Sequence, residues 1–538
     1  MPLGPFASRS AMTLPDWIVI ISYLAGMLGL SWWLSRGQKD EADYYVGGRT
    51  LPWWALALST MATQSSANSF LGIPAFVALA PGGGLTWLQY ELALPFAMIL
   101  LMLFLVPVFR GLHLISVYEY LERRFDRGTR LLLSAVFLLS RGLATGVAVY
   151  AAALVLQVCT GLSLAWCIVL MGGITVVYDT LGGMKAVVWS DVIQMLVLFA
   201  GIFVCGVTAV NIAGGWDAAI AAHAPERLAG LELGHGIGDG ARTPFWGFMV
   251  GGLVLYLSYY GVDQSQVQRQ LAAPSVRDAK RTLVFNGVAR FPLTLLYAAL
   301  GLAVGAVFHL SPDLRAAVPE GRLDYLVPRF IELFLPPGIR GLLVAAILAA
   351  AMSSLDSALN SLSAATLRDF VLPRLKSPRV LLASRLVTLL WGALITGFAF
   401  WVGDISTTVV EGINRLGAFF YGPLLAAFAA GVIDRRARGP GVVAGVVIGV
   451  GVNVWLLFQF GGQLFWMWWN ITGLVSAIVV TAGVSRLLAP PRAVQLEGTT
   501  ITRAALADSW RRNRTTYAGL FFYGLALIAF AAWCGVRR

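Results

Sequence analysis

The sequence predicts an all-α polytopic membrane protein, from its hydropathy, the length of its apolar segments and the placement of its basic residues. Of its 538 residues, 58% are hydrophobic and only 12% are charged, and the mean hydropathy is +0.76. This composition excludes an ordinary set of soluble domains. The formal net charge of +12 does not indicate a nucleic-acid partner, because the basic residues lie in short loops between apolar runs. The expected surroundings are a lipid bilayer.

Apolar runs long enough to cross a ~30 Å hydrocarbon core, which takes about 20 residues, occur about fourteen times. Between them there is no room for a kinase, nucleotide-binding or receptor domain. We predict membrane-spanning helices near 14-35, 54-79, 84-109, 130-158, 163-180, 185-212, 244-265, 282-309, 340-366, 380-403, 405-432, 440-460, 468-488 and 516-535.

The basic residues gather in alternate loops. The short loops between those groups, such as 80-83, 159-162 and 461-467, carry almost no positive charge. The positive-inside rule therefore places both termini outside the cytoplasm of a multi-pass protein, which we expect in the plasma (inner) membrane. The groups that determine this orientation include Arg36, Lys39 and Arg49; Arg123, Arg124 and Arg127; Arg269, Arg277, Lys280 and Arg281; Arg435, Arg436 and Arg438; and Arg511 and Arg512.

Two predicted helices are polar in their middle. In residues 59–69, eight of eleven side chains are polar, and Gly72 and Pro74 follow. A second interruption occupies residues 256–266, "YLSYYGVDQSQ". Since lipid cannot satisfy free backbone groups, such breaks predict discontinuous helices that line a cavity.

The spacing of the two interruptions predicts an inverted repeat of five helices plus five. Each interrupted helix opens one block, and the odd number of crossings reverses the second copy. The predicted organisation is an N-terminal extra helix in 1-35, a first repeat in 54-213, a second repeat in 243-432 and C-terminal accessory helices in 439-538.

The segment "AAAMSSLDSALNSLSA", residues 349–364, is amphipathic although it lies in an apolar run. At 100° per residue, one face carries Ser353, Ser354, Asp356, Ser357, Asn360 and Ser361. A carboxylate at the centre of a spanning helix costs about 2.5 to 3.5 kcal/mol, so Asp356 must face protein, water or a cation. Hydroxyls, carbonyls and carboxylates suit sodium. Asp191 either converges on this face or is solvated at a helix entrance.

Six motifs in this order resemble those of the sodium:solute symporter family. They are "DYYVGGRTLPWW", "SVYEYLERRF", "YDTLGGMKAVVWSDVIQ", "SYYGVDQSQVQRQL", "AAAMSSLDSALNSL" and "FFYGPLLAAFAAGVIDRRARGPG", and the resemblance covers nearly the whole chain. It implies a fold similar to the leucine transporter, with alternating access around sites near the bilayer midplane.

The resemblance also implies where sodium binds. The first site would use the carbonyls of Ala62, Ser65 and Ala350 and the hydroxyls of Ser353 and Ser354. A second site, present in some relatives, would use Asp191, Ser353, Asp356 and Ser357; Asp356 stands where that pattern has a hydroxyl.

Solute-binding positions follow from the same resemblance. Those of glucose-type relatives map onto Gln64, Ser69, Glu91, Tyr256 and Asn414, and only the acid Glu91 is retained, which disfavours a sugar. In sialic-acid-type relatives two hydroxyls hold the substrate carboxylate, and Ser66 and Ser69 match them. Tyr259 matches an aromatic gate and Tyr260 a neighbouring ring. Arg141 lies one turn before a carboxylate-pairing arginine, and is either that residue's counterpart or a partner for an acid such as Glu91.

We therefore expect a sodium-coupled symporter that imports a small, carboxylate-bearing organic solute, with sodium ions, solute and lipid as its partners. One alternative has the same fold but couples to protons through Asp356 and Asp191. Another is a membrane sensor that binds solute without moving it. An enzyme is not expected, because the polar groups are rich in hydroxyls and lack a nucleophile–base pair.

Overall fold

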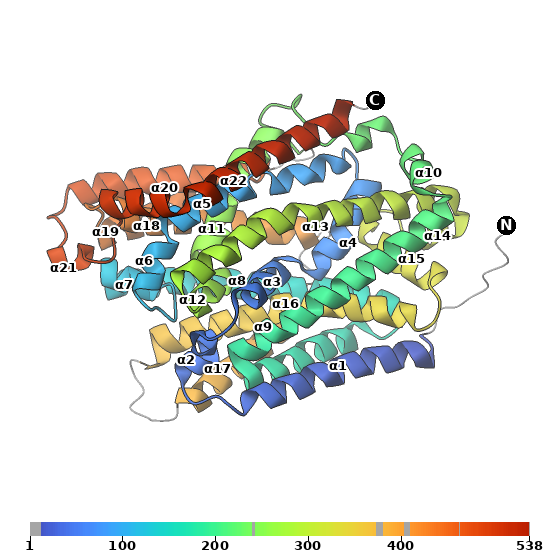
Figure 1. Ribbon diagram of the computed structural model, residues 1–538, viewed down its shortest axis with the longest axis horizontal. Coiled ribbons are helices and arrows are strands. Elements are labelled where there is room, and N and C mark those ends of the chain that lie inside the picture. The colour runs from blue at the N-terminus through green and yellow to red at the C-terminus, as the bar shows by residue number, and fades with distance from the viewer. Residues whose placement is uncertain (1–11, 239–242, 373–379, 403–408, 462, 537–538) are drawn as a thin grey trace.

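The protein is a bundle of long helices that run side by side, as the computed structural model shows (Figure 1). The structure describes residues 12–238, 243–372, 380–402, 409–461 and 463–536, without the side chains of Asn68, 409–416 and 535–536. Within these ranges the chain contains no strand. The predicted all-α class is therefore confirmed for the described residues.

The α-helices fall into long elements that form the bundle and shorter ones that lie within it or at its ends (Figure 1). The long ones are α1 (Leu14–Ser35), α8 (Arg127–Thr160), α9 (Leu164–Ala213), α13 (Val276–Leu310), α16 (Ile339–Thr366), α17 (Val380–Ala399), α18 (Val409–Ile433), α19 (Gly439–Phe460), α20 (Trp468–Arg486) and α22 (Arg503–Val536). The shorter ones are α2 (Glu41–Val46), α3 (Trp53–Gln64), α4 (Ala67–Ala78), α5 (Leu94–Phe104), α6 (Val106–Gly111), α7 (Glu119–Arg124), α10 (Trp216–Ala221), α11 (Gly252–Val262), α12 (Gln264–Ala272), α14 (Pro312–Ala317), α15 (Leu326–Phe334) and α21 (Ala493–Leu496).

Ten helices in the described ranges are long and apolar enough to cross a membrane. Three more apolar helices are shorter, spanning Ser69–Ala78, Gly247–Gly261 and Gly417–Ile433. The protein is therefore a multi-pass membrane protein, and the predicted number of about fourteen crossings stays a prediction. Residues 405–408 of the predicted 405-432 helix lie outside the described part of the chain.

The 50-residue helix α9 contains a break at Gly183, where φ is 54° and ψ is −157°. A straight helix of that length would measure about 75 Å, more than twice the hydrocarbon thickness. The break lies where the sequence predicted one helix to end near 180 and another to begin near 185. A Cβ atom at this glycine would lie 2.6 Å from the carbonyl oxygen of Tyr44, so both the conformation and the space require glycine.

Both predicted interruptions are present. Helix α3 ends at Gln64 and α4 starts at Ala67, with Ser66 extended between them (φ −79°, ψ 170°). Helix α11 ends at Val262 and α12 starts at Gln264, and Asp263 caps α12 by accepting a 2.8 Å hydrogen bond from the Ser265 amide. Four half-helices therefore end inside the bundle, where their free amides and carbonyls are available to ligands.

Helix α16 lies at the centre of the bundle. In the apolar 18-residue stretch of this helix 83% of the residues are buried, whereas only 17% are buried in the corresponding stretch of α1. It packs against α8 and α9 and contacts α3, α4 and α12. The polar face of α16 is thus directed at other helices, and α1 is left at the periphery, where lipid would surround it.

Candidate functional site

Two serines of α16 contact the end of the first half-helix, α3. The Ser353 hydroxyl lies 3.2 Å from the Ala62 carbonyl oxygen and 3.0 Å from that of Ala350. The Ser354 hydroxyl lies 3.4 Å from the Thr63 carbonyl and 3.5 Å from that of Ala350. Hydroxyl and carbonyl oxygens therefore converge where α3 unwinds, because the helix end leaves its last carbonyls without intrahelical partners.

Ser65 was also expected at the first sodium site, but it takes no part in these contacts between α3 and α16. Its hydroxyl instead accepts a 2.6 Å hydrogen bond from Arg290 of α13. The Ser65 amide donates to the carbonyl oxygens of Met61 and Ala62, both at 3.0 Å. The backbone at the break is thus fixed from α13 as well as from α16.

Arg290 belongs to a buried ion pair that the sequence analysis missed. Its Nε lies 3.1 Å from Glu91, whose carboxylate also accepts hydrogen bonds from Tyr256 at 2.8 Å and Thr294 at 3.0 Å. Arg290 and Glu91 are only 4% and 1% exposed. A lone arginine inside the apolar run 282-309 was the available signal, since ionisable residues within membrane helices have specific partners.

Arg141 is not the partner of Glu91. Its guanidinium lies 3.6 Å from the carboxylate of Asp263, the residue at the second break, and 5.8 Å from the centre of the Tyr259 ring. The sequence left two roles open for Arg141, and the pairing with Glu91 is excluded by this geometry. A cavity between α8, α11 and α18 is lined by Arg141, Asp263, Ser258, Val262, Phe137, Ser140, Ala144, Gly417, Phe420, Tyr421 and Leu424.

The remaining solute positions lie around the two breaks. Tyr260 donates a hydrogen bond to the Gln64 side chain, and its ring contacts that of Tyr259 at a centroid distance of 5.6 Å. Ser66 occupies the N-cap position of α4 without a side-chain capping hydrogen bond and is half-buried, as is Ser69. The side chain of Asn414 lies outside the described part of the chain.

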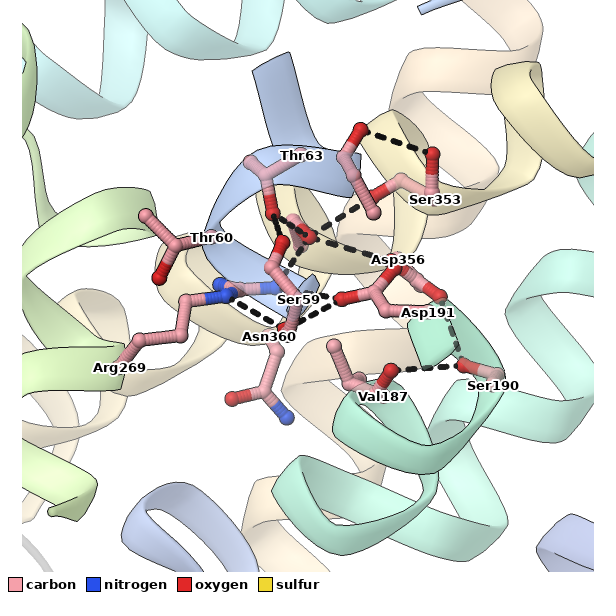
Figure 2. A network of polar contacts seen from close by, with 12 residues as sticks. Ser59, Thr60, Thr63, Val187, Ser190, Asp191, Arg269, Ser353, Asp356 and Asn360 are labelled. Carbon is pink, nitrogen blue, oxygen red and sulfur yellow. Dashed lines mark hydrogen bonds and ion pairs between the residues drawn. The ribbon is translucent and has the colours of Figure 1, made fainter. Parts of the chain in front are cut away.

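Asp191 lies in the centre of the bundle rather than at a solvated helix entrance, because its side chain is 0% exposed. Its carboxylate accepts a 2.5 Å hydrogen bond from Ser59 of α3 and pairs with Arg269 of α12 at 3.2 Å. Figure 2 shows these three side chains meeting between the helices. Of the two alternatives left open for Asp191, solvation at a helix entrance is therefore excluded.

Arg269 was expected in a cytoplasmic loop, and that expectation is also wrong, since its side chain is 0% exposed. Its Nε donates to Ser59 at 3.0 Å and its Nη1 to the Ser265 carbonyl at 2.5 Å. A further nitrogen donates to the Ser357 hydroxyl. The hydropathy pattern could not predict that Arg269 is buried. A basic residue near a helix end gives the same sequence pattern whether its side chain faces solvent or pairs with a buried acid.

Asp356 binds helix α9 without contacting Arg269. Tyr178 donates a hydrogen bond to its carboxylate, and the Ser190 hydroxyl lies 3.3 Å away. The neighbouring Ser357 hydroxyl is 3.3 Å from the other carboxylate oxygen and 2.8 Å from the Thr63 hydroxyl. Asp191, Ser353, Asp356 and Ser357, predicted as a second sodium site, thus belong to one connected network (Figure 2).

The chain is similar to known membrane transporters. A model of the sodium:solute symporter family matches residues 44–449. The sodium/iodide cotransporter of Homo sapiens is 33% identical over 459 residues, which are 82% of this chain and 69% of that protein. The sodium/sialic acid symporter SiaT of Proteus mirabilis (strain HI4320) is 28% identical, over 90% of this chain and 97% of that protein.

Among solved structures, a sodium-coupled sialic acid symporter in a substrate-bound outward-open state is similar, with a TM-score of 0.80 at 28% identity. The match covers 89% of this chain and 99% of that chain. These relatives are transporters rather than enzymes.

Proposed function

The chain belongs to the sodium:solute symporter family, and from this premise we propose that it imports a small carboxylate-bearing solute together with sodium by alternating access. Sodium coupling is the function that family membership itself supports.

The observation that carries the proposal is the set of oxygens between α3 and α16. Ser353 and Ser354 bring two hydroxyls within 3.5 Å of the carbonyls of Ala62, Thr63 and Ala350. Sodium prefers such neutral oxygens, which bind it without holding it too tightly for release. An ion here would replace the hydrogen bonds that now join the two helices, with the Ser65 carbonyl as a further proposed ligand. Sodium is a transported co-substrate at this site.

The start of α4 supports a carboxylate-bearing solute. Ser66 and Ser69 lie in the first turn of this half-helix, whose partial positive charge favours an anion. Their hydroxyls are the proposed donors to the carboxylate. Gln64 ends α3, and Tyr259 and Tyr260 lie in the last turn of α11, just before the second break. Glu91, Tyr256 and Asn414 complete the proposed pocket.

Alternating access would follow from sodium occupancy at the first break. A bound ion holds α3 against α16 and thereby fixes the turn that receives the solute, which ties the two binding events together. We propose the five-plus-five inverted repeat and about fourteen crossings as the framework of this motion, with residues 54-213 and 243-432 as the two repeats.

The proposed orientation has both termini outside the cytoplasm. In Figure 1 the start of α1 and the end of α22 lie at the right-hand end of the bundle. Helices α2, α7, α12 and α21, near which basic residues gather, lie at the left-hand end. The distribution of basic residues and the position of the termini together support an orientation in which the left-hand end of the bundle faces the cytoplasm. The proposed membrane is the plasma (inner) membrane.

A thermal-stability screen of the purified protein tests this function. Small carboxylates, sugars and amino acids are each added in sodium chloride and in choline chloride at equal ionic strength. We expect a carboxylate to raise the melting temperature in sodium and to have little effect in choline. Equal stabilisation in both salts would contradict sodium coupling, and stabilisation by sugars alone would contradict the carboxylate class. If a pH gradient drives uptake into liposomes without sodium, the proton-coupled alternative is correct.

A further inference from the structure

Resting on the proposed sodium-coupled function, we infer that Asp179 of α9, with Gln268 of α12 and Asn360 of α16, forms a further sodium site on the cytoplasmic side of the two sodium positions predicted from the sequence. Asp179 belongs to neither of those positions. The site holds the transported ion on its way to the cytoplasm.

The carboxylate of Asp179 is buried without a partner. The residue is 0% exposed, and neither of its carboxylate oxygens has a hydrogen-bond partner among the described residues. An ionised carboxylate in an apolar interior is strongly unfavourable unless a cation or several donors accompany it. Both oxygens of Asp179 are therefore available to a cation.

The amides beside Asp179 leave more acceptors than donors. Asn360 of α16 faces the carboxylate, and its Oδ1 accepts a 2.7 Å hydrogen bond from Gln268 Nε2. The same Gln268 nitrogen donates to the Tyr45 carbonyl at 2.6 Å, and the Gln268 Oε1 is left without a partner in the described part of the chain. The two hydrogens of Asn360 Nδ2 cannot satisfy the roughly four acceptor sites of an ionised carboxylate. One sodium ion satisfies several carboxylate and amide oxygens at once.

Three acids meet one base in this part of the bundle. Asp179, Asp191 and Asp356 are all fully buried. Within the described ranges, Arg269 is the only basic side chain that forms an ion pair with any of them. Two carboxylates therefore lack a counter-charge from the protein. Buried acids inside membrane proteins mark ion pathways, and mobile sodium ions supply the missing positive charge here.

The site lies closer to the cytoplasm than the first sodium position does. Helix α16 begins beside Asp16 of α1, at the end of the bundle that we assign to the outside. Ser353, Ser357 and Asn360 follow one another along its polar face. The seven residues from Ser353 to Asn360 span about 10 Å along the helix axis. An ion that moves along this face toward the cytoplasm therefore reaches Asp179 last.

Helix α2 covers the site on its cytoplasmic side. It packs against α9, α12 and α16. The Tyr44 hydroxyl lies 3.4 and 3.2 Å from the carbonyl oxygens of Asp179 and Thr180, and the Tyr45 hydroxyl lies 2.8 Å from that of Ser363. Both tyrosines are 0% exposed. Release of the ion therefore requires α2 to separate from α9.

The test counts sodium ions on the purified, full-length protein by equilibrium binding of ²²Na⁺, with choline replacing sodium in the blank. Wild type should bind one ion more per chain than Asp179→Asn, which keeps the shape of the side chain and removes its charge. Asp43→Asn is the matched control. It removes an acid at the same end of the bundle, one that pairs with Lys185 at 3.8 Å, and it should leave the count unchanged.

A second variant keeps the inference open to refutation if Asp179→Asn does not fold. Asn360→Leu removes the amide without changing the charge, and it should weaken binding of this ion about tenfold to a hundredfold. Equal counts and affinities in wild type and the folded variants would overturn the inference. A protonated-carboxyl infrared band that is lost in Asp179→Asn but unaffected by sodium in wild type would also overturn it, because a proton would then neutralise Asp179.

Failure of the proposed function gives a different result. Wild type that binds no sodium, or a sodium count that is unaffected by Ser353→Ala with Ser354→Ala, would contradict that function. If the double serine variant loses its ion and Asp179→Asn loses none, the inference alone is refuted.

Discussion

Replacing Ser353 and Ser354 together by alanine should strongly weaken sodium binding at concentrations that saturate the wild type. The two hydroxyls lie 3.0 to 3.5 Å from three carbonyls at the end of α3 and within α16. They are the side-chain ligands of the proposed first site. Replacing serine by alanine does not lower the helix propensity of α16 and does not change the charge of the region.

The size of the effect follows from the contacts. A hydrogen-bonding group contributes about 1.5 to 3 kcal/mol when its partner is charged. Losing two such ligands weakens sodium binding by about 3 to 6 kcal/mol, roughly a hundredfold to ten-thousandfold. Ser353→Ala alone should have the larger effect of the two single variants, because its contacts are 3.2 and 3.0 Å against 3.4 and 3.5 Å for Ser354.

Sodium-dependent thermal stabilisation measures this loss without knowledge of the solute. A ligand at a hundred times its Kd stabilises the folded state by about 2.7 kcal/mol. If binding is a hundred times weaker, the same concentration gives only about 0.4 kcal/mol. The melting temperature of the double variant should therefore be nearly the same in sodium chloride and in choline chloride, whereas that of the wild type differs.

Ser361→Ala is the matched control. This serine lies on the same face of α16, is fully buried and donates to the carbonyl of Ala358 in its own helix at 2.8 Å. Its replacement should leave sodium stabilisation intact. If the double variant responds to sodium as strongly as Ser361→Ala does, the oxygens between α3 and α16 do not bind sodium and the proposed mechanism is incorrect.

Three further predictions concern stability and orientation. Glu91→Ala should destabilise the protein by about 3 to 5 kcal/mol in SDS unfolding, because it leaves Arg290 buried without its acid. The double variant Glu91→Gln with Arg290→Met should be destabilised less, since it leaves no unpaired charge. A destabilisation under 1 kcal/mol for Glu91→Ala would show that the ion pair is dispensable. Gly183→Ala should cost about 1 to 3 kcal/mol, since it forces a positive φ and a clash with Tyr44, while Gly173→Ala, where a Cβ meets nothing within 4 Å, should be neutral. A C-terminal alkaline phosphatase fusion should be active and a green fluorescent protein fusion dark in bacteria, and the opposite result would reverse the orientation.

Local patterns were sufficient to identify the polar face of α16 and both interrupted helices. A run such as residues 59–69 cannot remain helical and lipid-exposed, because hydrocarbon offers no partner for hydroxyls or free backbone groups. The same argument applies to Asp356, whose charge in an apolar run requires protein, water or a cation nearby. These conclusions concern each segment and the solvent around it, so they need no knowledge of neighbouring helices.

Pairing between segments was decided only by the tertiary structure. Arg269 and Asp191 are 78 positions apart, and nothing in either segment indicates that one neutralises the other. Arg290 of α13 pairs with Glu91, which precedes α5, and Arg141 of α8 pairs with Asp263 at the second break, because the packing of the helices brings these groups together. A sequence specifies that a buried charge must be compensated, but the compensating group is chosen by helix packing, because only packing brings distant side chains within hydrogen-bonding distance.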